Sequence, residues 1–227
     1  MKKIAVVLSL LLLHSLALCQ YATKAISLAS DSSVYIYATD SSGELIPMGT
    51  GWFYNNTTIV TAKHVVTDYE KSTESKEVPW KKITIITAKN ETLVVVNTVL
   101  SVKYDVAKIT IKKPKKTYVP LKMATKESIK GDLVCGVGYD IDYDSHAFIG
   151  WNTGTRQDGF TRGQKFSITN ADVNPGHSGS AVLNIKGEVV GMAIGIDNRV
   201  SPDGEPVRGV SFFIPLTELK IALKNIK

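Results

Sequence analysis

The sequence has little cysteine, with only Cys19 and Cys135 among 227 residues. If Cys19 is removed with the N-terminal segment described below, Cys135 has no partner, so no internal disulfide can form and the core alone must hold the fold. Cys135 lies in the alternating apolar run "DLVCGVGY". This setting favours a buried structural thiol over a nucleophile.

Concentrated positive charge and metal-binding motifs are also missing. Lys and Arg outnumber Asp and Glu by 27 to 21, but they are scattered and form no arginine-rich or aromatic-interleaved stripe. We therefore expect no nucleic-acid partner. His64, His146 and His177 are dispersed along the chain, and neither an H-E-x-x-H pairing nor a cysteine cluster occurs. We accordingly expect no metal and no cofactor.

Helical patterns, repeats and linkers are scarce as well. Short segments rich in β-branched residues, such as "SVYIYAT", "KKITIIT" and "EVVGMAIGI", are separated by Gly, Asn, Asp or Pro, and Lys186-Gly187 marks a tight hairpin. One helix is predicted over 216–226, where Leu216, Leu219, Leu223 and Ile226 share a face. The pattern predicts an all-β fold, with a possible division into two barrels near "KKPKKTYVPL".

The first nineteen residues are different in character. Lys2 and Lys3 precede the apolar run "IAVVLSLLLL", which is followed by small residues, and this is typical of a secretory signal peptide over 1–19 with cleavage after Cys19. Cleavage lowers the formal net charge from +6 to about +4. The alternatives are a retained anchor, for which the run is short, and a lipoprotein acylated at Cys19, for which Leu18 is too large. We expect an exported protein, periplasmic or extracellular, with no stable membrane span.

The stretch "NADVNPGHSGSAVLN" crowds small residues around one hydroxyl. Ser178 is a candidate nucleophile, because the backbone N–H groups of Gly176 and Ser178 could point at one position and form an oxyanion hole. The alternative is a glycine-rich turn joining two strands.

A serine nucleophile needs a base and an orienting acid. His64 ends the strand-like "TTIVTAKHVV", from which it could project into a cleft, whereas His146 lies in a polar segment and His177 adjoins the serine. Asp105 stands at the mouth of the apolar run "VAKITIK". Each residue taken alone has an ordinary structural explanation, but the three together favour a catalytic triad.

Three segments resemble the histidine, aspartate and serine boxes of trypsin-like serine proteases with the chymotrypsin fold. They are "TGWFYNNTTIVTAKHVV", "YDVAKITI" and "NPGHSGSAVLNIKGEVVGMAIG", in the order His, Asp, Ser. "HVV" in the first box, "NIKGEVVGMAIG" in the third box and "GVSFFIPLTELK" are most similar to the protease domain of Deg/HtrA proteases, and we expect no PDZ domain after it. "GHSGSAV" is also similar to glutamyl endopeptidases. The likeness runs from about Gly49 to the C-terminus.

The resemblance implies two antiparallel six-stranded barrels, over about 30–115 and 120–215, within a protease domain that spans 20–227. It assigns His64 as general base, Asp105 as its orienter, Ser178 as nucleophile, and the Gly176 and Ser178 amides as the oxyanion hole. Polypeptides would be the substrates. Trypsin carries an acid directly before its serine, whereas this chain has His177 there. Activation by cleavage is therefore not expected. The oligomeric state is left open.

The sequence indicates the substrate specificity less clearly than the catalytic residues. Asp172 lies six residues before Ser178, at the spacing where trypsin places its pocket acid, and a buried carboxylate there would favour Lys or Arg substrates. The alternatives are a solvent-exposed turn acid and a pocket closed by a loop shaped as in Deg/HtrA proteases. Met192 and Ala193 would line the pocket wall and favour a medium-sized apolar residue.

Two other functional classes remain to be compared with an active endopeptidase. A catalytically inactive protease-fold protein could bind a partner through its cleft, although such proteins usually lose a triad residue and all three positions are filled here. An α/β-hydrolase esterase would place a helix after its serine, whereas strand-like "AVLNI" follows Ser178.

Overall fold

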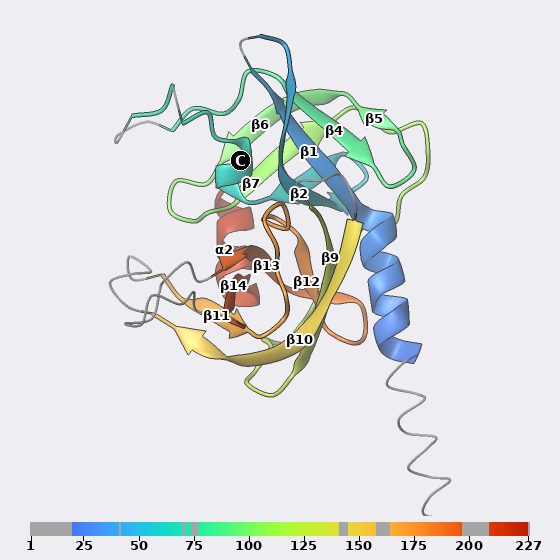
Figure 1. Cartoon of the computed structure of the whole chain (residues 1–227), viewed down its shortest axis with the longest axis vertical. Coiled ribbons are helices and arrows are strands. Elements are labelled where there is room, and N and C mark those ends of the chain that lie inside the picture. The colour runs from blue at the N-terminus through green and yellow to red at the C-terminus, as the bar shows by residue number, and fades with distance from the viewer. Residues whose placement is uncertain are drawn as a thin grey trace, which may run out of the picture.

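A computed structural model describes residues 20–40, 42–69, 71–73, 77–140, 145–157, 164–196 and 209–226. In this part of the chain, two antiparallel sheets curl into two barrels that stack one above the other (Figure 1). The expected signal peptide lies outside the described residues. No helix within the described ranges is long and apolar enough to span a bilayer.

The first barrel contains the N-terminal strands. In spatial order these are β5-β4-β1-β2-β3-β7-β6, and the barrel they form is nearly closed. Their bounds are β1 (Ser33–Thr39), β2 (Leu45–Asn55), β3 (Thr58–Thr61), β4 (Ile83–Thr87), β5 (Thr92–Leu93), β6 (Val95–Leu100) and β7 (Ala107–Ile111).

The second barrel is a closed ring of six strands, because β12 pairs with both β9 and β13. A seventh strand, β8, adds to the outside of β13 in parallel. The bounds are β8 (Lys122–Met123), β9 (Leu133–Tyr139), β10 (Ser145–Arg156), β11 (Phe166–Thr169), β12 (Ala181–Leu183), β13 (Glu188–Ile196) and β14 (Ser211–Pro215). The predicted all-β, two-barrel architecture is confirmed, although the short β8 and the long β10 were not among the predicted strands.

Strand β1 explains how the barrels join. Its alternate residues Val34, Ile36 and Ala38 are buried hydrophobic residues, and Val34 and Ile36 belong to the main hydrophobic core. The other face carries Tyr35, whose ring stacks on Tyr139 of β9 with centroids 5.1 Å apart. Both faces of β1 are therefore buried, one of them at the barrel junction.

The predicted C-terminal helix is confirmed as α2 (Leu216–Asn225). Its predicted apolar face is buried, and the helix packs on β13 and β14. Lys108 of β7 donates from Nζ to the carbonyl oxygens of Leu223 (2.6 Å) and Ile226 (2.9 Å). A first-barrel lysine thus satisfies carbonyls at the end of a helix that packs on the second barrel.

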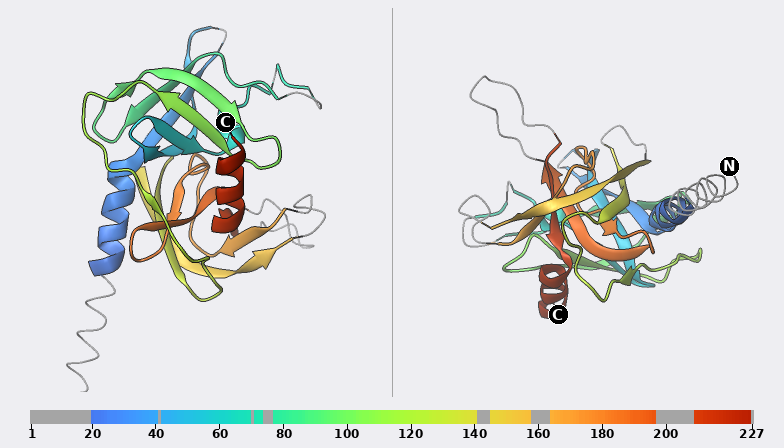
Figure 2. Two further views of the ribbon diagram at one scale, coloured as in Figure 1. Left: turned by 180° about the vertical axis from the view of Figure 1, so that it is seen from behind. Right: turned by 90° about the horizontal axis from the view of Figure 1, so that it is seen from below.

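A second helix, over residues 20–32, was not predicted from the sequence. Ala25 and Ala29, one turn apart, are buried, and Leu28 packs over Gly187 in the hairpin between β12 and β13. The helix and α2 lie against different sides of the second barrel (Figure 2). Its apolar face is narrow, so tertiary contacts rather than a strong sequence pattern stabilise it.

Cys135 lies in the middle of β9, opposite Ile149 of β10 and Leu183 of β12. Its exposed fraction is 0%, and burial raises the pKa of its thiol to about 11. It is a structural thiol, as its sequence context predicted.

We predict that native Cys135 resists iodoacetamide at neutral pH, because the thiol is both inaccessible and protonated. Mass spectrometry should show one added carbamidomethyl group at Cys135 only after denaturant unfolds the chain. Equal modification rates of the folded and unfolded chains would contradict this burial.

Candidate active site

His64 lies on a short 3-10 helix, η1 (Lys63–Val66), directly after β3. His64 was predicted to end a strand, but β3 ends at Thr61, three residues before it. The buried side chains of Val65 and Val66 anchor this turn, and the Trp80 amide donates to the Val66 carbonyl (2.9 Å). The His64 side chain remains 33% exposed, so it faces a solvent-accessible position from a fixed backbone.

Asp105 holds His64 at two points. His64 Nδ1 donates to Asp105 Oδ2 (2.6 Å), and the His64 backbone N–H donates to Oδ1 (2.9 Å). Asp105 lies just before β7, between the buried residues Tyr104 and Val106. Because a carboxylate only accepts hydrogen bonds, this pairing places the ring proton on Nδ1 and leaves Nε2 as the free base.

The pair shifts the pKa of each partner. Burial by itself would lower the pKa of His64, but the hydrogen bond and negative charge of Asp105 outweigh it, and the pKa is raised above the ordinary value. Burial would raise the pKa of Asp105, but the hydrogen bonds and charge of His64 lower it overall. Asp105 is therefore ionised at neutral pH and stabilises a protonated His64.

Ser178 lies in a tight loop between β11 and β12 that two glycines make possible. Gly176 and Gly179 have φ values of +98° and +89°, which side chains rarely permit. A side chain at Gly176 would collide with the carbonyl of Tyr139, and one at Gly179 with the carbonyl of Thr50. The crowding of small residues around Ser178 thus reflects close packing of this loop, which we call the serine loop (residues 174–180).

Thr50 of β2 fastens the serine loop to the first barrel. Its Oγ1 donates to the Gly176 carbonyl (2.8 Å) and accepts from the Tyr139 amide (2.8 Å), while its own amide donates to the Ser178 carbonyl (2.9 Å). The Thr61 hydroxyl in turn donates to the Thr50 carbonyl (2.6 Å). Sequence reasoning missed Thr50, although "TGW" opens the histidine box.

The serine loop lies beside the turn that carries His64. A Cβ built on Gly49 would lie 2.7 Å from the side chain of Val65 and 2.8 Å from the Ser178 carbonyl. A Cβ on Gly179 would lie 2.9 Å from the amide of Ala62. The candidate base and nucleophile therefore come from neighbouring segments of two different barrels.

The Ser178 hydroxyl donates to the carbonyl of Ile194 (3.2 Å). Among the hydrogen bonds of the described residues, none joins Ser178 to His64. None uses the N–H of Gly176 or of Ser178, so both donors are available to a ligand. The local arrangement therefore offers two backbone donors beside an alcohol.

The residues predicted for a substrate pocket do not share one cavity wall. Asp172 is exposed, which matches a turn acid rather than a buried pocket carboxylate. Met192 and Ala193 are fully buried and pack into two different core clusters. The Ala193 backbone nevertheless supports the site, since its carbonyl accepts from the Gly179 amide (2.8 Å).

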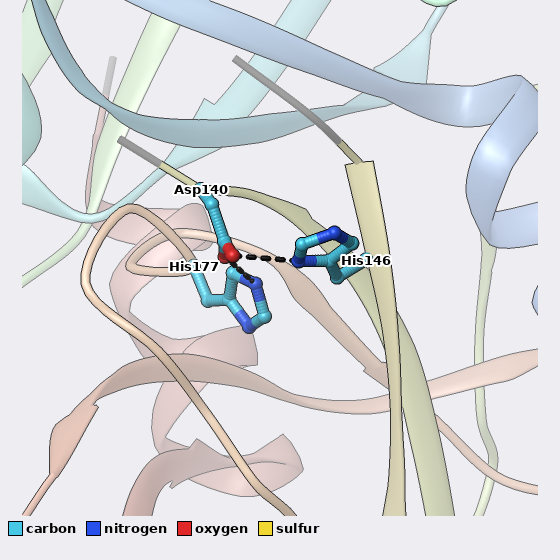
Figure 3. A group of neighbouring side chains, drawn as sticks. All are labelled: Asp140, His146 and His177. Atoms are coloured by element: carbon cyan, nitrogen blue, oxygen red, sulfur yellow. Dashed lines mark hydrogen bonds and ion pairs between the residues drawn. The ribbon is translucent and has the colours of Figure 1, made fainter. Parts of the chain in front are cut away.

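His146 and His177 lie on either side of Asp140 (Figure 3). His146 is the second residue of β10 and is exposed, whereas His177 is buried. We expected no metal site because the histidines are dispersed along the sequence. In the folded chain, however, these two histidines lie close together.

Comparison with known proteins shows the family. A trypsin-like peptidase domain profile matches residues 49–192, more than half of the chain. A probable periplasmic serine endoprotease, DegP-like, of Buchnera aphidicola is 31% identical over 117 residues, covering 50% of this chain and 24% of the relative. The periplasmic serine endoprotease DegP of Escherichia coli K12 is 29% identical over 119 residues, covering 51% and 24%. The chain thus spans about a quarter of these relatives' length.

Solved structures share the fold. The HtrA-type protease AlgW with a decapeptide superposes with a TM-score of 0.68 at 17% identity, over 89% of this chain and 66% of that one. The active form of the Rv3671c protease from M. tuberculosis gives 0.67 at 20% identity, over 89% and 83%. The profile match, together with this fold, shows that the chain belongs to the trypsin-like peptidase domain family.

Proposed function

We propose that the protein is an exported serine endopeptidase that cleaves peptide bonds through Ser178, His64 and Asp105. The observation that carries this proposal is the two-point contact between Asp105 and His64, beside a serine loop docked onto the same barrel. The family and the periplasmic serine endoproteases similar to half of this chain support both the activity and export.

In the proposed reaction, Ser178 Oγ leaves the Ile194 carbonyl, turns to Nε2 of His64 and attacks the substrate carbonyl. His64 takes the hydroxyl proton, and Asp105 stabilises the imidazolium that forms. His64 then protonates the leaving amine, which departs and leaves an acyl-enzyme on Ser178. Water, deprotonated by His64, hydrolyses the acyl-enzyme and restores the serine.

The oxyanion of each tetrahedral intermediate would be stabilised by the free N–H groups of Gly176 and Ser178. Each donor of such a hole contributes about 3 kcal/mol to transition-state stabilisation. Their directions depend on the positive φ of Gly176 and on the two hydrogen bonds from Thr50 to the serine loop. Rigid positioning matters, because donors already oriented need no reorganisation during the reaction.

A catalytically inactive binding protein is the second candidate function. One observation favours it, namely the hydrogen bond of the Ser178 hydroxyl to Ile194 instead of His64. Hydrogen bonds in substrate-free sites often differ from those of the reacting complex. A reactivity test of the serine separates the two functions.

A fluorophosphonate probe should label the wild-type chain at Ser178, since only an activated serine attacks the reagent. Ser178→Ala should lose labelling, and His64→Ala should reduce it by about 10³-fold or more. Ser180→Ala is the matched control, because Ser180 is a buried neighbour whose hydroxyl has no hydrogen-bond partner in the described structure, and labelling should persist. An unlabelled but folded wild-type chain would support the inactive binding protein.

Asp105→Asn should lower kcat by about 10⁴-fold, because an amide neither stabilises the imidazolium nor selects the Nδ1–H tautomer. The pH dependence of kcat/KM gives a second readout. Wild-type activity should fall as pH drops through the raised pKa of His64, which must be neutral to act as base. Loss of the Asp105 charge lowers that pKa, so the residual activity of the variant should persist to lower pH. An unchanged acidic limb would contradict the assigned pairing.

Thr50→Val should lower kcat with little change in KM. It leaves the partly buried Gly176 carbonyl and the buried Tyr139 amide without their partner, at about 1–3 kcal/mol for the buried amide. Thr50→Ser keeps the hydroxyl and is the matched control. Steady-state kinetics should place Thr50→Ser near wild type. Similar activity of the two variants would show that this hydroxyl does not orient the oxyanion donors.

A further inference from the structure

Asp140, His146 and His177 form a compact cluster outside the proposed triad (Figure 3). Asp140 Oδ1 lies 2.6 Å from His177 Nε2, and Asp140 Oδ2 lies 2.6 Å from His146 Nδ1. These donor atoms all lie within 4.8 Å of one another. Two imidazoles and one carboxylate are a donor set typical of a transition-metal site.

The fold brings these residues together through Gly138. His146 on β10 pairs with Gly138 on β9, and directly paired residues of antiparallel strands point to the same face. Gly138 has no side chain, and the ring of His177 occupies the space: a Cβ there would lie 2.5 Å from its Cγ. The glycine therefore admits a histidine from the serine loop next to His146.

The cluster rests on a rigid frame. The Asp140 carbonyl accepts from the hydroxyl of Tyr35 (2.9 Å), and the ring of Phe148 stacks against His177 with centroids 5.7 Å apart. Gly176 packs against the backbone of Tyr139 and Asp140. A site whose ligands are held by such surroundings loses little entropy when an ion binds.

The contact between Asp140 and His177 is close but is not a hydrogen bond. Asp140 Oδ1 and His177 Nε2 are buried, and neither has a hydrogen-bond partner with acceptable angles in the described structure. His177 is only 1% exposed. A buried carboxylate oxygen and a buried imidazole nitrogen without hydrogen-bond partners are both free to bind an ion.

We propose that Asp140, His146 and His177 bind Zn²⁺ through a carboxylate oxygen, Nδ1 and Nε2, respectively. Ligands about 2.0 Å from a tetrahedral ion lie roughly 3.3 Å apart, so the contacts of 2.6 Å need only a small expansion. Each ring then carries its proton on the other nitrogen. For His177 this breaks the hydrogen bond that Nδ1 accepts from the amide of Asn174 (3.3 Å). Imidazole ligands disfavour Ca²⁺ and Mg²⁺.

A bound ion would link the serine loop to the second barrel. His177 lies between Gly176 and Ser178, the two residues whose amides form the proposed oxyanion hole, while Asp140 and His146 belong to the β9–β10 region. Zn²⁺ therefore adds a metal link to the hydrogen bonds that Thr50 makes to the same loop. The site does not depend on the reactivity of the serine, so it can be tested in a chain that carries Ser178→Ala.

Isothermal titration of metal-free Ser178→Ala protein with Zn²⁺ should show one ion per chain. Co²⁺ should produce visible absorption bands with the intensity of a four-coordinate site. Zn²⁺ should also raise the melting temperature by several degrees, because binding to the folded chain stabilises it. A stoichiometry well below one, or no change in melting temperature at saturating Zn²⁺, would overturn the proposal.

Variants assign the ligands. In the Ser178→Ala chain, the further substitution His146→Ala should weaken Zn²⁺ binding roughly tenfold or more. It should also abolish the rise in melting temperature on Zn²⁺ binding. This side chain is exposed, so the variant should fold even if His177→Gln does not. His64→Ala is the matched control, since it removes the other histidine that pairs with a carboxylate, and Zn²⁺ affinity should persist. Unchanged affinity in the His146 variant, or its loss in the His64 variant, would place the ion elsewhere and reject the site.

Discussion

The candidate site depends on one buried hydroxyl at the junction of the two barrels. Thr50 is fully buried, and its Oγ1 connects the Gly176 carbonyl in the serine loop with the Tyr139 amide at the end of β9. Its own amide binds the Ser178 carbonyl. A single residue of β2 thereby fixes the position of the serine loop and the position of the second barrel relative to the first. Since buried polar groups are costly when unpaired, alternative arrangements of these segments are disfavoured.

The barrels contribute complementary parts. In the first barrel His64 follows the end of β3 and Asp105 precedes the start of β7. The two strands pair antiparallel with Thr61 opposite Ala107, so the sheet register brings the acid and the imidazole together. The second barrel holds Ser178 in a loop whose glycines permit close approach to Thr50 and Tyr139. Because the nucleophile and its proposed base come from different barrels, the site exists only when the barrels are docked. The stacked pair of Tyr35 and Tyr139 strengthens that docking.

The serine loop is held from two directions. Thr50 binds it from the first barrel, and Asp140 of the second barrel contacts the His177 side chain of the loop. His177 occupies the position where trypsin has an acid, and here the acid partner, Asp140, comes from the end of β9. In this chain the histidine lies on the serine loop and the carboxylate at the end of β9. The side chain of Asp140 is 19% exposed, whereas that of His177 is 1% exposed.

Local patterns in the sequence determined the all-β class, the C-terminal helix and the crowding of glycines around Ser178, because strand alternation, helical periodicity and positive φ are properties of short segments. The same patterns missed the helix over 20–32 and strand β10, whose exposed residues weaken any period. Asp172 looked like a pocket acid from its spacing alone, yet it is exposed.

Tertiary structure alone decided the role of Thr50, the burial of Met192 and the meeting of His146 with His177. Contacts between residues 30 to 130 positions apart depend on how the barrels close and dock, which no local pattern encodes.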